Sequence, residues 1–249
     1  MPRSIPITIA AYNESMVQAL LGPLRPFVHA GDEVDLVSGN HDRPLSVPTL
    51  DGWVDQLLRA LPEGVRFSAH TSGLENATSI AAQASPKLET ILLDYEPNWD
   101  PEFTWDFTAT LTHLDRFAQA CHSRGRRAVA YPTGRPIKEP ALQKYRWDYG
   151  EMRGHVDEVY PQTQHWATLD APTWVAALEV LRSQRRAHAL SPTALVAQLT
   201  IGDRENGLRA APATERFREA RSGGLERLFL WWAPTTLGEA EMFLGSLET

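Results

Sequence analysis

Short apolar segments alternate with amphipathic segments along the whole chain, and this alternation constrains the fold more than any other feature. The apolar segments have the length of buried strands, and the amphipathic segments repeat apolar residues at helical spacing. Strands are expected over residues 6–12, 33–40, 65–70, 88–96, 127–132, 156–163, 194–201 and 227–233. Helices are expected over residues 15–20, 50–61, 74–84, 104–124, 139–153, 171–188, 211–222 and 236–247.

Eight strand–helix units in 249 residues match a (β/α)8 barrel, in which helices surround a closed parallel sheet. An open doubly wound sheet would need fewer units and would usually carry a glycine-rich phosphate loop. The sequence contains neither G-x-G-x-x-G nor G-x-x-x-x-G-K-S/T. It also shows no glycine- or serine-rich linker and no internal repeat. The sequence therefore predicts an α/β protein with a single (β/α)8 TIM barrel domain over residues 1–249.

Charge and hydropathy exclude several classes of partner. The formal net charge is −7, and the basic clusters at 124–127 and 182–186 fall late in expected helices, where cations offset the helix dipole. We therefore expect no nucleic-acid partner. No apolar run approaches the roughly 20 residues that cross a bilayer, and the amino terminus lacks an apolar signal core. We expect no membrane association and a cytoplasmic location, although a secreted chain without its leader would look the same.

The fourth expected strand ends in two carboxylates, Asp94 and Glu96, followed by Pro97 and Trp99. Successive strand side chains alternate between faces, so both carboxylates point the same way, about 7 Å apart along the strand. Each charge disfavours ionisation of the other, which keeps one carboxyl protonated near neutral pH for acid catalysis. The alternative is a solvated carboxylate pair at a strand end, or a helix cap.

Barrel enzymes carry their chemistry at the carboxyl ends of the strands, and here these ends are rich in aromatic and amide side chains. Aromatic faces cover the C–H face of a sugar ring, and amides match its hydroxyl groups. Trp231 and Trp232 face opposite sides of one strand, so at most one looks into the barrel; Trp99 and Trp232 are the expected platforms. The candidate substrate-binding residues are Tyr12, Asn40, His70, Trp99, Tyr131, Tyr160, Gln162, Gln164, Gln198, Trp231 and Trp232.

A metal site is the alternative use of the strand-end histidines. His41, His70 and His165 could form a ligand set together with Asp94. The sequence has no H-x-H or H-E-x-x-H spacing, so nothing local favours zinc. We expect no metal and no cofactor, and each histidine is interpreted as a hydrogen-bonding pocket residue. A serine nucleophile is not indicated either, because no G-x-S-x-G elbow occurs.

The segment Leu92-Leu93-Asp94-Tyr95-Glu96 resembles the end of the D-x-x-D-x-D-x-E signature of chitinase-type (family 18) glycoside hydrolases. Residues 159–164 and 228–232 stand where that family has substrate-binding polar groups and a tryptophan beneath the sugar. The resemblance implies a TIM barrel that cleaves N-acetylhexosaminides with retention. It implies that Glu96 protonates the leaving oxygen and that Asp94 orients the substrate's 2-acetamido group, which acts as the nucleophile.

The sequence also departs from that signature. The two earlier aspartates fall on Glu89 and Leu92, the sixth-strand tyrosine falls on Gln164, and the third strand lacks S-x-G-G. Lysozyme-type family 25 hydrolases are similar over Asp94–Glu96, but their early aspartate is not evident in the first strand. The fold and the acid role of Glu96 therefore transfer better than the substrate does.

We expect a glycoside hydrolase-like enzyme that binds a small-molecule or oligosaccharide substrate, with Glu96 as proton donor. One alternative is a cytoplasmic biosynthetic enzyme, such as a cyclase, isomerase or lyase, that uses the same barrel and acid. The other is a non-hydrolytic carbohydrate-binding barrel. The presence of both Asp94 and Glu96 argues against this last class, because a lectin-like site needs no protonated acid.

Overall fold

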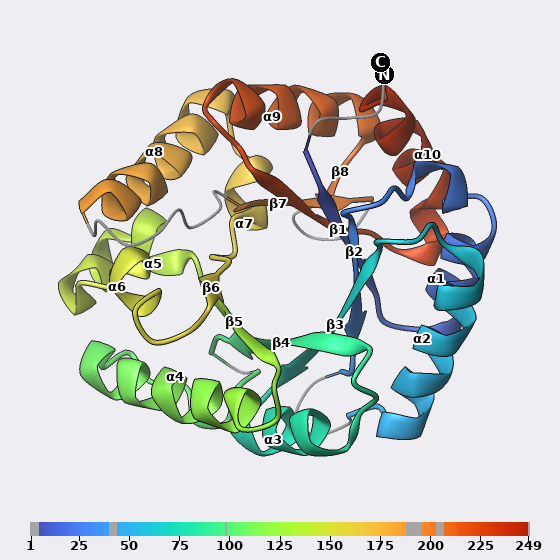
Figure 1. Ribbon diagram of the computed structural model, residues 1–249. Helices are drawn as coiled ribbons and strands as arrows, with labels where there is room; N and C mark the ends of the chain where they lie inside the picture. Colours follow the sequence, from blue (N-terminus) through green and yellow to red (C-terminus); the bar gives the residue numbers. More distant parts are fainter. Residues whose placement is uncertain (1–4, 40–43, 98, 188–195, 203–206, 249) are drawn as a thin grey trace.

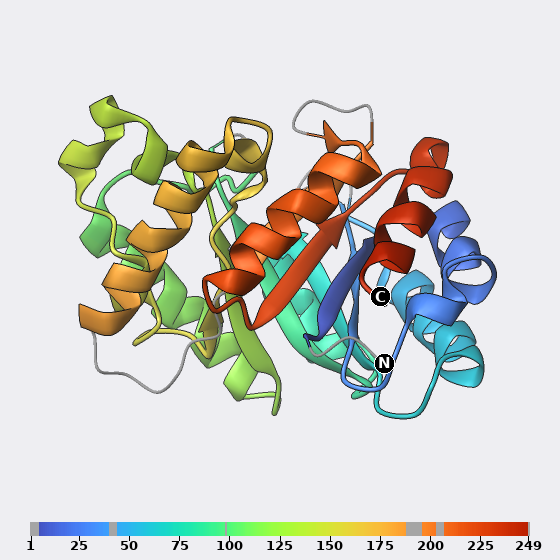
Figure 2. The same ribbon diagram turned by 90° about the horizontal axis from the view of Figure 1, so that it is seen from above.

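A computed structural model describes residues 5–39, 44–97, 99–187, 196–202 and 207–248. In these residues a parallel sheet of nine strands curls around a central axis, and helices cover its outer face (Figures 1 and 2). The expectation of an α/β barrel is confirmed. Across the sheet the strands run in the order β6 (Glu158–Val159), β5 (Arg127–Pro132), β4 (Leu88–Tyr95), β3 (Arg66–Ser72), β2 (Glu33–Val37), β1 (Ile7–Ala11), β9 (Arg227–Trp231), β7 (Val196–Ile201) and β8 (Gly207–Leu208).

The helices form the outer ring, and several begin at a side-chain cap. Asn13, Ser46 and Asp106 each accept a hydrogen bond from a backbone N–H of the first turn. No helix in the described part of the chain is long and apolar enough to span a bilayer. The helices are α1 (Glu14–Leu21), α2 (Val47–Ala60), α3 (Leu74–Gln83), α4 (Phe107–His122), α5 (Arg135–Lys138), α6 (Tyr149–Met152), α7 (Gln164–Ala167), α8 (Ala171–Ala187), α9 (Ala210–Ser222) and α10 (Leu237–Ser246), with 3-10 turns η1 (Arg25–Phe27), η2 (Pro140–Tyr145) and η3 (Pro234–Thr236).

The structure departs from the expected elements between β5 and β7. In place of the helix expected over 139–153 the chain forms η2 and α6, because Pro140 lacks a backbone donor and Arg146 adopts a left-handed φ of 52°. The sixth strand is shorter than expected, since Pro161 cannot donate to a ladder. The chain still follows β5 beyond β6, as the backbone N–H of Gln162 donates to the carbonyl of Pro132 at 3.0 Å. The short helices α5 and α7 and the strand β8 were not expected.

Side chains join the sheet where β6 and β7 meet. No backbone pairing links these two strands in the described residues. Instead, Gln198 Nε2 donates to the carbonyl oxygens of Tyr160 and Pro161, each at 3.0 Å. The backbone N–H of Gln198 donates to Thr163 Oγ1 at 2.7 Å. One buried amide therefore closes the barrel at this seam.

Alternation of side chains along the strands divides the molecule into two apolar regions. The larger one lies between the sheet and the helices and includes Ile9, Leu36 and Leu93. The smaller one fills the barrel interior and consists of Ala10, Leu92, Val129, Tyr131, Tyr160, Val196 and Phe229. Because this inner cluster fills the barrel interior, a ligand cannot pass through the barrel and can bind only at its open end.

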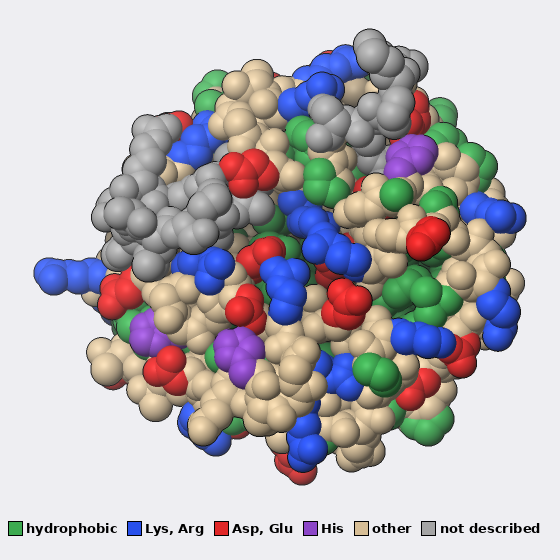
Figure 3. Space-filling model, viewed as in Figure 1, with side chains coloured by type: hydrophobic (Ala, Val, Ile, Leu, Met, Phe, Trp, Pro, Cys, Tyr) green, Lys and Arg blue, Asp and Glu red, His purple; other side chains and the backbone are tan. Residues whose placement is uncertain are grey.

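The starts of the strands carry a set of ion pairs that we call the charged floor: Glu33, Arg66, Arg127, Glu158 and Arg227. Glu33 lies 3.6 Å from Arg227 and 3.7 Å from Arg66, and burial raises the pKa of its carboxyl despite these cations. Figure 3 shows acidic and basic side chains gathered in the middle of the molecule in this view along the barrel. Paired charges thus occupy the barrel end at the strand starts, and the pocket lies at the opposite end.

We expect Gln198→Leu to destabilise the protein by about 2–4 kcal/mol, because two buried carbonyls and the Tyr131 hydroxyl lose their partner. The free energy of unfolding from urea denaturation measures the effect. Gln83→Leu, at an exposed position on α3, is the matched control and should change stability by less than about 0.5 kcal/mol. Equal stabilities of the two variants would contradict the role given to Gln198.

Candidate active site

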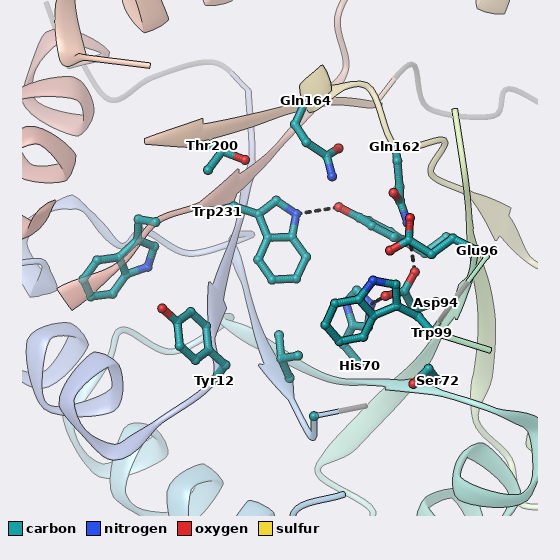
Figure 4. Close-up of a pocket in the computed structure, with 14 residues that line it drawn as sticks. Tyr12, His70, Ser72, Asp94, Glu96, Trp99, Gln162, Gln164, Thr200 and Trp231 are labelled. Carbon is teal, nitrogen blue, oxygen red and sulfur yellow. Dashed lines mark hydrogen bonds and ion pairs between the residues drawn. The ribbon is translucent and has the colours of Figure 1, made fainter. Parts of the chain in front are cut away.

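A pocket of about 440 Å³ opens among the carboxyl ends of the strands (Figure 4). Side chains from most of the strands, or from the loops that follow them, contribute to its wall. Aromatic rings, amides and carboxyl groups dominate this wall. The lining residues are Tyr12, Val37, Gly39, His70, Ser72, Asp94, Glu96, Trp99, Tyr131, Gln162, Gln164, Thr200, Trp231 and Trp232.

The structure brings most of the sequence-derived candidates together on this wall. Ten of them are among the lining residues: Asp94, Glu96, Tyr12, His70, Trp99, Tyr131, Gln162, Gln164, Trp231 and Trp232. Tyr160 and Gln198 are fully buried and do not line the pocket. Tyr160 directs its hydroxyl to Glu158 in the charged floor, and Gln198 forms the seam of the barrel. Asn40 and His41 lie outside the described residues, as does the side chain of His165.

The two consecutive tryptophans of β9 and its end have opposite surroundings. Trp231 packs with the inner cluster, and its Nε1 donates to the Tyr131 hydroxyl at 2.6 Å. Trp232 belongs to the outer core with 1% of its surface exposed, and its Nε1 donates to the carbonyl of Ala10 at 2.9 Å. The inward position therefore belongs to Trp231, whereas the sequence analysis favoured Trp232 as the platform. Trp99, the other expected platform, lines the pocket with 45% of its surface exposed.

The carboxyl pair lies on the inner face at the end of β4. Tyr95, between the two carboxyls, points outward, where its hydroxyl accepts a hydrogen bond from the backbone N–H of Thr104 at 3.1 Å. Asp94 and Glu96 consequently share the pocket side. Burial and the negative charge of Asp94 raise the pKa of Glu96 to about 8, against opposing contributions from Gln162, His70 and Arg135. Glu96 is therefore a protonated acid at neutral pH.

Asp94 is held by two side chains. Gln162 Nε2 donates to Asp94 Oδ1 at 2.9 Å, and His70 Nε2 lies 3.7 Å from Asp94 Oδ2. On the other side of the imidazole, His70 Nδ1 lies 3.0 Å from Asp35 Oδ2. Ser68 Oγ donates to Asp35 Oδ1 at 2.8 Å. A continuous chain of polar contacts thus leads from β2 through β3 to the carboxylate on β4.

His70 is only 2% exposed, and burial by itself disfavours its charged form. Asp35 and Asp94 outweigh this effect and raise the pKa of His70 to about 10. Sequence reasoning missed Asp35, although a signal was present. In Glu33-Val34-Asp35-Leu36, acidic residues alternate with apolar ones, so one face of this strand had to carry buried charge.

Aromatic rings fix the imidazole from the side. The rings of His70 and Tyr131 meet edge to face with centroids 4.8 Å apart, and those of His70 and Trp231 with centroids 5.5 Å apart. Tyr131 donates its hydroxyl hydrogen to Gln198. Burial raises the pKa of the Tyr131 phenol well above its usual range. These side chains form a rigid wall below the carboxyl pair.

Three polar atoms of lining residues are buried and lack a hydrogen-bond partner among the described residues: Ser72 Oγ, Gln164 Oε1 and His70 Nε2. Buried polar atoms are normally paired, so Ser72 Oγ and Gln164 Oε1 are suited to meet polar groups of a ligand, whereas His70 Nε2 faces Asp94 Oδ2 at 3.7 Å. Within the described part of the chain, no group of three or more His, Cys, Asp or Glu side chains is arranged to hold a metal ion.

No protein-family model and no curated protein matches the sequence. Solved structures do match. The glycoside hydrolase domain of PgaB (BpsB) from Bordetella bronchiseptica superposes with a TM-score of 0.68 at 12% identity, over 99% of this chain and 98% of that domain. A chitinase from Chromobacterium violaceum superposes with a TM-score of 0.64 at 11% identity, over 98% of both chains. The fold is that of chitinase-like glycoside hydrolase barrels. The resemblance proposed from the sequence is confirmed as a distant structural one.

A third match shows what this similarity leaves open. A variant of methylaspartate ammonia lyase from Clostridium tetanomorphum superposes with a TM-score of 0.58 at 10% identity, over 99% of this chain and 58% of the lyase. A barrel of this shape therefore also occurs in an enzyme of another reaction class. The reaction of the present chain has to be argued from the side chains of its own pocket.

We expect the raised pKa of Glu96 to make stability depend on pH. Between about pH 4.5 and 8 the folded state keeps a proton on Glu96 that the unfolded state releases. The free energy of unfolding should therefore fall as pH rises through this range, by at most about 1.4 kcal/mol per pH unit. Urea denaturation between pH 5 and 9 measures the slope.

Glu96→Gln should remove this part of the slope, so that the variant gains stability relative to the wild type as pH rises. Glu89→Gln, at an exposed position on the same strand, is the matched control and should keep the wild-type slope. Parallel curves for the wild type and Glu96→Gln would show that Glu96 ionises in the folded state as it does in the unfolded one.

Proposed function

We propose that this protein is a retaining glycoside hydrolase that acts on an N-acetylhexosaminide or a related glycan. The observation that carries the proposal is the carboxyl pair at the end of β4, where burial keeps a proton on Glu96 and Asp94 is held by Gln162. A glycosidic oxygen is a weak base, so its bond breaks readily only when an acid protonates it as it leaves. Glu96 is that acid.

In the first step Glu96 transfers its proton to the glycosidic oxygen while the bond from this oxygen to the anomeric carbon breaks. The carbonyl oxygen of the substrate's 2-acetamido group attacks the same carbon and closes a positively charged five-membered ring. In the second step the Glu96 carboxylate takes a proton from a water molecule, whose oxygen opens this ring. The acetamido group is restored, Glu96 regains its proton, and the anomeric configuration is retained.

The substrate amide is the proposed nucleophile because of where the carboxyls lie. Two carboxyls that act as acid and nucleophile flank the scissile bond from opposite sides. Asp94 on β4 and Glu96 directly after this strand are two residues apart and line the same side of the pocket. Asp94 is also engaged by the Gln162 amide. It is therefore better placed to accept the N–H of the acetamido group and to stabilise the positive ring than to attack the sugar.

Aromatic and amide side chains support a carbohydrate as the substrate. Trp231 and Tyr12 present ring surfaces to the pocket, and Trp99 stands exposed at its rim. Gln164 and Ser72 offer buried polar atoms that match sugar hydroxyl groups. Two of the solved structures that share the fold are a glycoside hydrolase domain and a chitinase. These observations support a carbohydrate as the substrate class.

We expect Glu96→Gln to lower the hydrolysis of N-acetylglucosamine oligomers by at least about 100-fold, because the amide cannot donate a proton to the leaving oxygen. Affinity for the oligomer should change little, since Gln has nearly the same shape as Glu. Release of reducing ends measures turnover, and calorimetry measures binding. The first-formed product should show the substrate's anomeric configuration by NMR.

Glu89→Gln again serves as the matched control and should retain full activity, because Glu89 is exposed and lies outside the pocket. If Glu96→Gln kept most of the activity, the acid role would be refuted. If the wild type bound the oligomer and released no reducing ends, the protein would be a carbohydrate-binding barrel. A cyclase, isomerase or lyase would convert its substrate without any hydrolysis of such oligomers.

A further inference from the structure

We propose that His70, anchored by Asp35, is a permanently charged positioning residue that directs the proton shared by the carboxyl pair to Glu96 and leaves the negative charge on Asp94. The catalytic meaning of this inference rests on the proposed function. The charge state of His70 itself does not, and it can be measured without any substrate. The D-x-x-D-x-D-x-E signature falls on β4 and the residue after it, whereas His70 lies on β3.

The first argument is the geometry around the imidazole. Its two nitrogens face two different carboxyl groups, Asp35 at 3.0 Å and Asp94 at 3.7 Å. A neutral imidazole has one N–H, so one of its nitrogens would direct a lone pair at a carboxylate oxygen. The protonated ring offers an N–H to each side. The position between two carboxylates therefore selects the imidazolium form.

The second argument is burial. Asp35 is 0% exposed, and its partners are the Ser68 hydroxyl and His70. A buried carboxylate requires a compensating charge, because burial of an unpaired ion costs several kcal/mol. If His70 lost its proton, Asp35 would remain as such an ion. Asp35, on the side of the imidazole away from the pocket, thus keeps His70 protonated.

The groups around His70 come from each strand packed against it. Asp35 faces it from β2, and Asp94 faces it from β4, with Glu96 directly after that strand. The Tyr131 phenol on β5 and the Trp231 ring on β9 stand at its edges. Among these described neighbours the carboxyls are the groups that can carry a charge near neutral pH. His70 is accordingly a cation surrounded by three carboxyl groups, of which one must keep its proton.

The His70 cation lies next to Asp94, so the two carboxyl groups of the pair have different electrostatic surroundings. Its Nε2 lies 3.7 Å from Asp94 Oδ2, while Gln162 donates to the other oxygen of the same carboxylate. Both contacts favour negative charge on Asp94. Glu96 then lies beside an anion in a largely buried position, and these two conditions favour its protonated form and outweigh the opposing charge of His70. Without His70, Asp94 would lose one of the two contacts that favour its negative charge and would keep only the one from Gln162.

The departure of the chain from the D-x-x-D-x-D-x-E signature explains why Asp94 takes its charged neighbour from other strands. The position two residues before Asp94 holds Leu92, which is packed in the inner apolar cluster, and the earlier position holds Glu89, which is exposed. The strand that carries the pair therefore offers Asp94 no buried ionisable neighbour below it. In this chain β3 and β2 supply one instead, as His70 and Asp35.

The direct test follows the imidazole of His70 by NMR as a function of pH in the absence of substrate. The signal is assigned by its loss in His70→Gln, with His122→Gln, which removes an exposed imidazole, as the assignment control. We expect the signal to stay at the protonated position from pH 5 to 9 and to titrate only at about 10. A midpoint near 6.5, as in an unperturbed histidine, would overturn the proposal.

A second measurement separates a charge role from a merely structural one. In His70→Gln we expect the first ionisation of the carboxyl pair, followed by carboxyl 13C NMR, to move to higher pH by about one unit or more. The acidic limb of the kcat/KM profile should move with it. A residue that only filled space would lower activity at every pH and leave both limbs where they are; that result would overturn the proposal.

Asp35→Asn covers the case in which His70→Gln does not fold. It keeps the imidazole and its packing but removes the anion, so the midpoint of His70 should fall by at least about one pH unit. An unchanged midpoint would contradict the role given to Asp35. If His70 proves to be charged while N-acetylglucosamine oligomers are not cleaved, the proposed function fails and the charge assignment stands.

Discussion

A parallel sheet that curls into a barrel forces every second side chain of its strands into one narrow interior, and in this protein that interior contains ionisable groups. Because water is excluded there, each charge has to find its partner on a neighbouring strand. The charged floor at the strand starts satisfies this requirement with ion pairs. Nearer the pocket the same requirement is met by Asp35, His70 and Asp94, which lie on three adjacent strands.

This constraint links stability and chemistry. The inner apolar cluster separates the charged floor from the pocket and carries the rings that hold His70 in place. Gln198 closes the seam between β6 and β7 and accepts the hydroxyl hydrogen of Tyr131, so barrel closure and the pocket wall share one amide. The carboxyl at the end of this network, Glu96, is the one whose proton the surroundings retain. The acid chemistry proposed for Glu96 thus depends on side chains from β2 to β9.

Much of the architecture was predictable because it follows from local periodicity. Eight strands were expected near their observed places, and the alternation rule placed Asp94 and Glu96 on one face. The prediction was wrong where proline and a left-handed residue interrupt regular structure, as at Pro140 and Arg146, and where Pro161 shortens the sixth strand. Asp35 was missed because the alternation of acidic and apolar residues over 33–36 indicates a charged face but does not name the partner, His70, which lies 35 residues away in the chain.

The sequence by itself determined the barrel and the carboxyl pair at the end of one strand, because hydrophobic spacing and side-chain alternation are properties of consecutive residues. Only the tertiary structure decided that Trp231 rather than Trp232 faces inward, that Tyr160 and Gln198 lie below the pocket, and that His70 stands between Asp35 and Asp94. These facts depend on which strands become neighbours and on how deeply each side chain is buried. Such properties arise from contacts between residues distant in the chain, and no local pattern encodes them.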